Sequence, residues 1–166
     1  MKPIEYQENE FKLKRKETVH FVLLHSYSIF LIAVVLGVFL DIVFKLKIFS
    51  NEIYKYVGFA MLIISSLIIY WAQSTSANYQ ERVHKKEGRS NFEFGPYRYM
   101  RSPTHFGLFI MTIGFALIIN SLFSVIFTII AYAITKLFFL KREEKILEKK
   151  YGEVYRDYKK KVRNWI

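Results

Sequence analysis

The sequence lacks cysteine and has little glycine or proline, with 7 and 3 of these among 166 residues. Without cysteine the chain can form no disulfide framework, thiol nucleophile or Cys-ligated metal centre. Its four histidines show no paired spacing, which argues against a zinc site. We therefore expect no metal, and the sequence gives no sign of the redox state of its compartment.

Charged residues are missing from three long stretches, residues 21–40, 56–80 and 102–135. These lengths match a bilayer, whose hydrocarbon core of about 30 Å needs roughly 20 helical residues. The chain nevertheless carries a net charge of +11 alongside 52% hydrophobic residues. A basic groove for nucleic acid would not come with three charge-free blocks, so no nucleic-acid partner is expected. The pattern indicates an integral, multi-pass membrane protein.

The apolar stretches predict an all-α fold with about four transmembrane helices in a single membrane domain, residues 1–166. No small-residue cleavage site follows the first apolar run, which indicates a retained span and not a signal peptide. A single helix over residues 103–140 would measure about 57 Å, roughly twice the hydrocarbon thickness, so this block must fold back. Asn120 and Ser121 are the expected tip of the resulting hairpin. The expected spans are residues 19–44, 53–77, 104–119 and 122–140.

Lysine and arginine are unevenly shared between the expected loops. Four spans place residues 1–20, 79–103 and 141–163 on one side, and these hold five, six and ten cationic residues. The opposite side has three lysines in one loop and none at the hairpin tip. The positive-inside rule therefore predicts that both termini and the loop 79–103 are cytoplasmic.

The tail, residues 141–166, keeps a helical period, with apolar or aromatic residues every three or four positions. Gly152 marks an expected break between two helices. A cation-rich amphipathic tail of this kind is expected to lie along the cytoplasmic surface of the membrane.

Turn residues and polar side chains concentrate in the segment GPYRYMRSPTHFG, residues 95–107. Pro96 and Pro103 stiffen the chain, and Pro103 suits the first turn of the next helix, with Ser102 as its cap. The free N–H groups of such a helix start suit a carboxylate or a phosphate. Gly107 allows close approach of another helix or of a ligand. Caps and small residues also serve ordinary helix packing, so a ligand site and a packing role both stay open.

Two ionisable side chains near the same membrane boundary have alternative interpretations. His105 could be a general base, a ring that stacks on a ligand, or a hydrogen-bonded packing residue. Lys136, about one turn from the end of the last span, could extend its ammonium group to the lipid headgroups or take part in a site.

Glu143 and Glu144 follow the last span and offer a pair of carboxylates. On a solvated helix face they would join pairs such as Lys141 with Glu144 and Lys145 with Glu148, worth a few tenths of a kcal/mol. Beside a membrane pocket, paired carboxylates are also suited to holding an ammonium or sulfonium cation.

The C-terminal half resembles two families of integral membrane enzymes, the isoprenylcysteine carboxyl methyltransferases and the phospholipid methyltransferases. Their usual pattern is Gly-x-Tyr, then Arg-His-Pro-x-Tyr-x-Gly opening a helical hairpin, then Glu-Glu followed by Leu, then Gly and spaced tyrosines. The counterparts here are GPY (95–97), RSPTHFG (101–107), EEKIL (143–147) and YGEVYRDYKKKVRNW (151–165).

The resemblance implies S-adenosylmethionine as methyl donor, bound at the cytoplasmic face between the hairpin, the preceding loop and the tail. It implies that Glu143 contacts the methionyl ammonium, with Glu144 beside it. The reaction would be an in-line displacement at the methyl carbon, to which positioning contributes most. By position, the residues implied to line the cofactor site are Tyr97, Ser102, Pro103, Thr104, His105 and Gly107, with residues 89–92, including Phe92, as a further edge.

The sequence departs from the family pattern at three positions. Ser102 stands where histidine is frequent, His105 where tyrosine is frequent, and Phe139 where a basic residue often meets a substrate carboxylate. Lys136, Arg142 or Arg163 could supply the missing cation. A prenylcysteine carboxylate would need that cation, whereas an amine, thiol or other lipophilic acceptor would not.

The expected function is therefore methyl transfer from S-adenosylmethionine to a lipophilic or prenylated acceptor that enters from the bilayer. A membrane scaffold of the same fold without catalysis is the alternative that the departures favour. A transporter or channel subunit fits less well, because no acidic or basic residue lies in the middle of a span.

Overall fold

In the computed structural model, residues 4–44, 52–83 and 94–162 are described. Every regular element among them is helical, as predicted. In chain order they are α1 (Ile4–Phe44), α2 (Ile53–Val83), the 3-10 turn η2 (Gly95–Arg98), α3 (Pro103–Ile118), α4 (Leu122–Ile134), the π-helical segment η3 (Thr135–Leu140), α5 (Lys141–Tyr151) and α6 (Glu153–Lys161).

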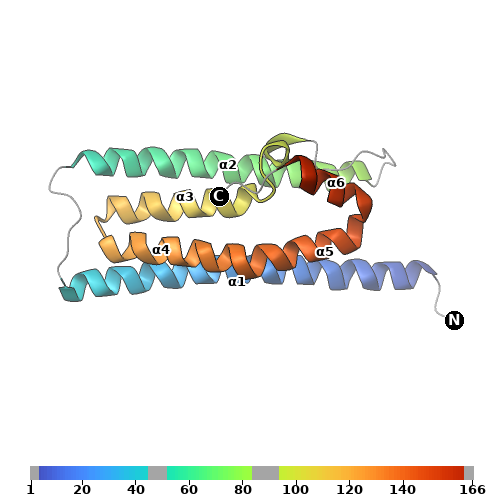
Figure 1. The fold of residues 1–166 in the computed structure, drawn as a ribbon, viewed down its shortest axis with the longest axis horizontal. Coiled ribbons are helices and arrows are strands. Elements are labelled where there is room, and N and C mark those ends of the chain that lie inside the picture. Colours follow the sequence, from blue (N-terminus) through green and yellow to red (C-terminus); the bar gives the residue numbers. More distant parts are fainter. Residues whose placement is uncertain (1–3, 45–51, 84–93, 163–166) are drawn as a thin grey trace.

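The four long helical stretches lie side by side in the order α2, α3, α4, α1 (Figure 1). Glycines allow close contact between α2 and α3, since a Cβ on Gly114 would lie 2.9 Å from the carbonyl oxygen of Gly58. A Cβ on Gly37 of α1 would likewise collide with the backbone of Ser124 on α4. Small residues at such crossings let helices pack closely where no hydrophobic effect drives them together.

Three helices are long and apolar enough to span a membrane, over Leu24–Phe44, Ile53–Ser76 and Leu122–Lys149. The fourth apolar helix, Pro103–Ile118, has 16 residues and is shorter. Large apolar side chains are exposed along α1 and α2, among them Leu31 at 65%. The outside of the bundle is therefore apolar, which confirms a multi-pass membrane protein. The single domain over residues 1–166 and the cytoplasmic termini stay predictions.

Two helices extend beyond the expected spans, whose bounds in the membrane stay predictions. The expected first span began at residue 19, but α1 begins at Ile4, because the charged segment before the apolar run is rich in Glu, Lys, Gln and Arg, which favour helix. The second span was expected to end at residue 77, but α2 continues to Val83 through a similarly polar segment.

The predicted hairpin tip is confirmed. Asn120 has φ of 57°, a left-handed conformation that asparagine tolerates, and it lies between α3 and α4. Ser121 is the N-cap of α4 and accepts a hydrogen bond from the Ser124 amide at 3.1 Å. Its hydroxyl also donates to the Asp41 carboxylate near the end of α1. The tip is thus fixed to the neighbouring helix.

The π-helical segment η3 lies between α4 and α5, and one of its turns contains one residue more than a turn of α-helix. That face runs through Ser124, Thr128, Ala131 and Thr135 at steps of three or four, and the next buried residue is Leu140, five positions on. Such π turns occur often at functional sites.

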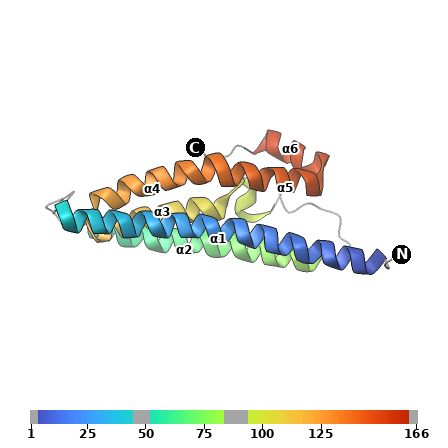
Figure 2. The same cartoon turned by 90° about the horizontal axis from the view of Figure 1, so that it is seen from below.

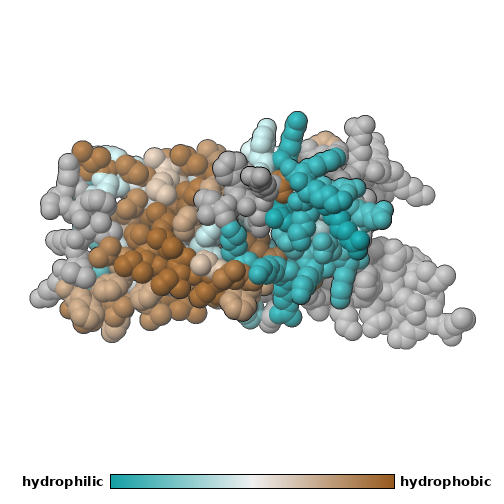
Figure 3. All heavy atoms as spheres, in the orientation of Figure 1, coloured by the Kyte–Doolittle hydropathy of each residue, from teal (hydrophilic) through white to brown (hydrophobic). Residues whose placement is uncertain are grey.

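Hydrophilic side chains are gathered at one end of the molecule. Figure 3 shows brown, apolar atoms over most of the visible bundle and teal, hydrophilic atoms over α5 and α6. The predicted break at Gly152 is confirmed, with φ of 58° between the two tail helices. The apolar face of α6 packs inside the protein, since Tyr155 and Tyr158 are 2% and 7% exposed.

Candidate functional site

Two regions about 40 residues apart in the sequence meet at the polar end: η2 with the start of α3, and α5 with α6. Figure 2 shows α5 diverging from α1 toward this end, and η2 packs on α2. The turn η2 is stabilised by the Pro96 carbonyl, which accepts hydrogen bonds from the amides of Tyr99 and Met100, both at 3.1 Å. Gly95 has φ of 59° and packs directly on Thr75 of α2, so only glycine fits there without strain.

The start of α3 presents backbone N–H groups toward this end. Ser102 occupies the predicted N-cap position and Pro103 the first turn, but the Ser102 side chain makes no capping hydrogen bond in this described turn. The first intrahelical bond runs from the Phe106 amide to the Ser102 carbonyl at 3.2 Å. The amides of Thr104 and His105 precede that bond and carry the partial positive charge of the helix start.

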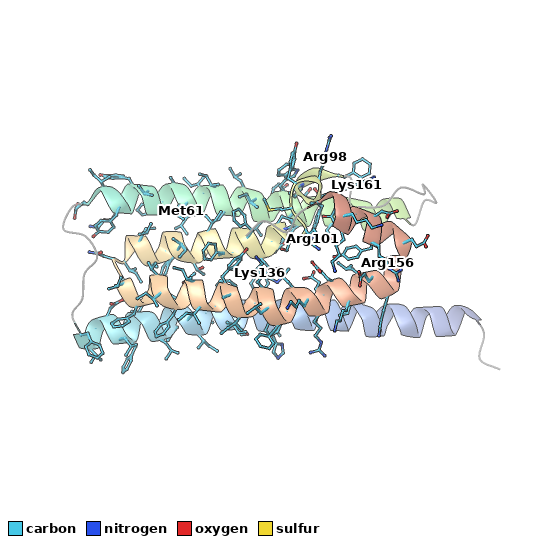
Figure 4. The ribbon with its side chains drawn as sticks, in the orientation of Figure 1. Met61, Arg98, Arg101, Lys136, Arg156 and Lys161 are labelled. Carbon is cyan, nitrogen blue, oxygen red and sulfur yellow. The ribbon has the colours of Figure 1, made fainter. Side chains whose placement is uncertain are left out.

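Glu144 is occupied by two cations. Its Oε1 lies 2.7 Å from Arg101 Nη1 and its Oε2 lies 2.9 Å from Lys159 Nζ. Lys159 also lies 3.6 Å from a carboxylate oxygen of Glu148. The hydrogen bond to Glu144 raises the pKa of Lys159 above its ordinary value, so the Lys159 ammonium stays charged. The network joins the start of α3, α5 and α6, and Figure 4 shows Arg101 between these elements.

Glu143 lies beside this network, but its carboxylate is not used in the same way. Its Oε2 is buried and has no hydrogen-bond partner among the described residues. The carboxylate is near enough to Tyr97 and Tyr155 to act on both electrostatically. Burial and then the Glu143 charge raise the pKa of Tyr97. A buried acceptor without a partner costs stability unless a ligand supplies the missing donor.

Arg101 offers the matching group of opposite charge. Its Nε is buried and makes no hydrogen bond within the described part of the chain. Tyr155 lies within electrostatic reach of both Arg101 and Glu143, which puts the two unsatisfied groups in one cluster.

Tyrosines tie the tail to η2. The Tyr158 hydroxyl donates to the Tyr97 carbonyl at 2.7 Å, and the rings of Tyr155 and Tyr158 pack with centroids 5.8 Å apart. The Tyr97 side chain is hydrogen-bonded to Thr104 at the start of α3. The tail therefore forms one wall of the cluster instead of lying apart from it.

Comparison with known proteins identifies the family of this chain. The sequence profile described as phospholipid methyltransferase matches residues 53–154, more than half of the chain. The chain belongs to the phospholipid methyltransferase family. Two curated relatives are described as "Probable protein-S-isoprenylcysteine O-methyltransferase", from Oryza sativa subsp. indica and subsp. japonica. Each is 33% identical over 119 residues, which cover 68% of this chain and 60% of the relative. No solved structure is significantly similar to this chain.

The chain thus spans about 60% of the length of those relatives. The family match includes η2, the hairpin and α5 but ends at residue 154, so Tyr155, Tyr158 and Lys159 of α6 lie beyond the matched region.

The structure brings together only some of the residues predicted from the family pattern. Tyr97, Thr104, Glu143 and Glu144 lie in or beside the cluster. His105 is 4% exposed and its Nε2 lies 3.3 Å from Ser26 Oγ of α1, so its ring is used inside the bundle.

The remaining predicted residues are spread over other surroundings. Gly107 packs on Ile69 of α2, since a Cβ would lie 2.6 Å from Ile69 Cγ1. Lys136 is half-buried on η3, while Arg142 is exposed on the outer face of α5. Residues 89–92 with Phe92, and Arg163, lie outside the described residues.

Sequence reasoning overlooked Arg101, Lys159, Tyr155 and Tyr158 as members of the site. Arg101 opens the motif RSPTHFG, so its signal was present in the family pattern. Lys159 carries no such signal, because nothing local in a lysine-rich tail distinguishes it from its neighbours.

Proposed function

We propose that this chain is an S-adenosylmethionine-dependent methyltransferase that methylates a lipophilic or lipidated acceptor at the membrane face carrying the polar end. The observation that supports it most is the pair of buried, unsatisfied groups, Glu143 Oε2 and Arg101 Nε. Glu143 Oε2 is a hydrogen-bond acceptor on a carboxyl group, and Arg101 Nε is a hydrogen-bond donor on a guanidinium group. The methionyl end of the donor is a zwitterion with an ammonium and a carboxylate, and these groups complement it.

The fit assigns different tasks to the two glutamates. Glu143 would accept the ammonium, whereas Glu144 is already occupied by Arg101 and Lys159. Glu144 therefore acts on the guanidinium, holding it where Nε can face the donor carboxylate. Charge-assisted hydrogen bonds of this kind are about twice as strong as neutral ones.

The aromatic residues would orient the donor and exclude water. Tyr97 is held by Thr104, and its raised pKa keeps its hydroxyl neutral near physiological pH. Tyr155 is buried against both charged groups. When bound, S-adenosylmethionine supplies an activated methyl group on a sulfonium centre. The chain then needs to align donor and acceptor, which can contribute much of the rate enhancement without a covalent intermediate.

The acceptor is proposed as a class. The family description names phospholipids, and the two rice relatives are described as acting on isoprenylcysteine. The exposed apolar surface beside the polar end would let either kind of molecule reach the site from the bilayer. Phe139 supplies no cation for an acceptor carboxylate, which favours an amine, thiol or other uncharged lipophilic group over a prenylcysteine carboxylate.

Donor binding tests the proposal directly. Purified protein in detergent is titrated with S-adenosylmethionine by calorimetry, alongside Glu143→Gln and the matched surface variant Glu153→Gln. We expect saturable binding to wild type and Glu153→Gln, and strongly weakened binding to Glu143→Gln. No binding to any of the three would reject the enzyme and favour the scaffold.

The acceptor is tested separately. The protein is incubated with methyl-labelled donor and, in parallel arms, phosphatidylethanolamine, S-farnesylcysteine or a total membrane lipid extract. Mass spectrometry then looks for a product heavier by one methyl group. Binding of the donor without a product in any arm would reject the proposed acceptor class.

A further inference from the structure

The outer face of the continuous helix from α4 through η3 to α5 changes character within one turn. Leu137 and Phe138 are exposed at 54% and 68%, at the end of an exposed apolar stripe along α4. The exposed positions that follow are all cationic. They are Lys141, Arg142, Lys145 and Lys149, called here the α5 ridge.

The carboxylates that could have neutralised this ridge point elsewhere. On a solvated helix face, one of the two alternatives for the glutamates, Lys141 would pair with Glu144 and Lys145 with Glu148. The structure does not have these pairs, because Glu144 and Glu148 lie on the inner face and bind Lys159, with Arg101 as a further partner of Glu144. Among the side chains that the structure describes, which do not include those of residues 4–23, 77–83, 150, 151 and 154, the α5 ridge forms no ion pair.

The position of the ridge limits what it can meet. Leu137 and Phe138 belong to the apolar stripe that faces lipid. The α5 ridge begins at Lys141, about one helical turn, or about 5.4 Å, beyond them. That distance places the cations at the headgroup layer of the same leaflet. Figure 3 shows the same change, with hydrophilic atoms following directly on the apolar surface.

We propose that the α5 ridge binds the anionic headgroups of phospholipids in the leaflet next to the polar end. The phosphate and any further negative charge of such lipids complement four cations that form no ion pair with the described side chains. A soluble polyanion would have to reach cations that lie against the bilayer, where lipid phosphates are already present. The α5 ridge lies on the opposite face of α5 from Glu143 and Glu144, so lipid binding there is separate from the proposed methyl-transfer site.

The expected strength follows from cations near an anionic surface, each of which contributes about 1 kcal/mol, or about fivefold in affinity. Removing three of them should therefore reduce the preference for an anionic lipid by up to about a hundredfold. The preference should also fall as ionic strength rises, because salt screens exposed charges.

Competition between two lipids tests the proposal. Full-length protein in a mild non-ionic detergent is mixed with equal amounts of phosphatidylglycerol and phosphatidylcholine of identical acyl chains. Native mass spectrometry then compares the bound lipids. We expect wild type to retain phosphatidylglycerol, and Lys141→Gln/Lys145→Gln/Lys149→Gln to lose that preference by about tenfold or more.

The matched control removes three exposed cations from α6, as Arg156→Gln/Lys160→Gln/Lys161→Gln. Figure 4 shows Arg156 and Lys161 on that helix. We expect the control to keep the wild-type preference. Equal loss in both triple variants would overturn the proposal in favour of net charge alone, and no preference in wild type would also overturn it.

A folding check excludes a trivial result. Far-UV circular dichroism and elution volume of the α5 triple variant should match wild type, since all three side chains are exposed. If the triple variant is misfolded, single Lys145→Gln is measured instead, with about a fivefold loss expected and an unchanged preference contradicting the proposal.

Discussion

Replacing Glu143 and Glu144 separately by glutamine should change this protein in opposite ways. Glutamine at 144 removes the anion that lies 2.7 Å from Arg101 and 2.9 Å from Lys159. Removing one partner of a buried ion pair costs about 3–5 kcal/mol. The Arg101 and Lys159 side chains keep 15% and 38% exposure, so water recovers part of this. We expect Glu144→Gln to lower the free energy of unfolding by about 2–3 kcal/mol.

Glutamine at 143 should not destabilise the protein. The Glu143 Oε2 atom is buried without a described partner, and leaving such a group unsatisfied costs about 1–3 kcal/mol. A neutral amide of the same shape should leave stability unchanged or raise it by up to about 1 kcal/mol. The same change removes the proposed acceptor for the donor ammonium. A hydrogen bond to a charged group is worth about 1.5–3 kcal/mol, so donor affinity should fall by about 10- to 150-fold.

Thermal unfolding and donor titration in one detergent measure both effects. For a chain of this length, 1 kcal/mol corresponds to about 2–4 °C in Tm, so Glu144→Gln should unfold about 4–12 °C below wild type. Glu153→Gln, at an exposed position of α6, controls for the loss of one acidic group.

Two results would refute this reasoning. A Glu144→Gln protein as stable as Glu153→Gln would mean that the ion-pair network does not hold the polar end together. A Glu143→Gln protein whose donor affinity is within about twofold of wild type, about 0.4 kcal/mol, would remove Glu143 from the site.

Three further perturbations have definite expected outcomes. Gly95→Ala and Gly152→Ala both force alanine to positive φ, but only the alanine at 95 also collides with α2. In thermal unfolding, the Gly95→Ala protein should therefore be less stable than the Gly152→Ala protein by about 1–3 kcal/mol. Burial raises the pKa of Tyr158 above its ordinary value of 10.0. The contribution of Tyr158 to the free energy of unfolding is therefore complete below about pH 10 and is lost as pH rises further. Limited proteolysis, which reports how well the tail is docked, should cleave the tail faster above pH 10. Tyr158→Phe removes the 2.7 Å hydrogen bond and should remove part of this pH dependence. Gly37→Ala places a methyl group against the backbone of Ser124 and should cost about 1–3 kcal/mol by thermal unfolding, whereas an unchanged Tm would contradict this helix contact.

Features with a local cause could be predicted from the sequence. Asn120 was recognisable as the tip because a polar pair interrupts an apolar block twice as long as a bilayer needs, and its left-handed φ confirms the turn. Gly152 was recognisable as the break in the tail for a similar reason. In both cases the decisive residue and its conformation lie at the same place in the chain.

Features that depend on distant partners could not be predicted in this way. The spacing rule paired Glu144 with Lys141, whereas the fold pairs it with Arg101, 43 positions away. The amphipathic pattern of the tail predicted that its apolar face lies along the membrane surface, whereas in the structure that face packs inside the protein and Tyr158 donates to the Tyr97 carbonyl of η2. A helical period identifies a face to be buried and says nothing about which surface buries it.

The π-helical segment η3 has a consequence for changes in chain length. Thr135 and Leu140 lie on the same buried face although five residues separate them, so this turn absorbs one residue more than an α-helix would. Deleting one residue there should relax the turn to α-helix and leave the carboxylates facing inward. Deleting one residue between Leu140 and Glu143 would instead rotate them by about 100° toward lipid. Deleting one residue before Leu140 should therefore preserve the carboxylate positions of the site, whereas deleting one residue after Leu140 should abolish them.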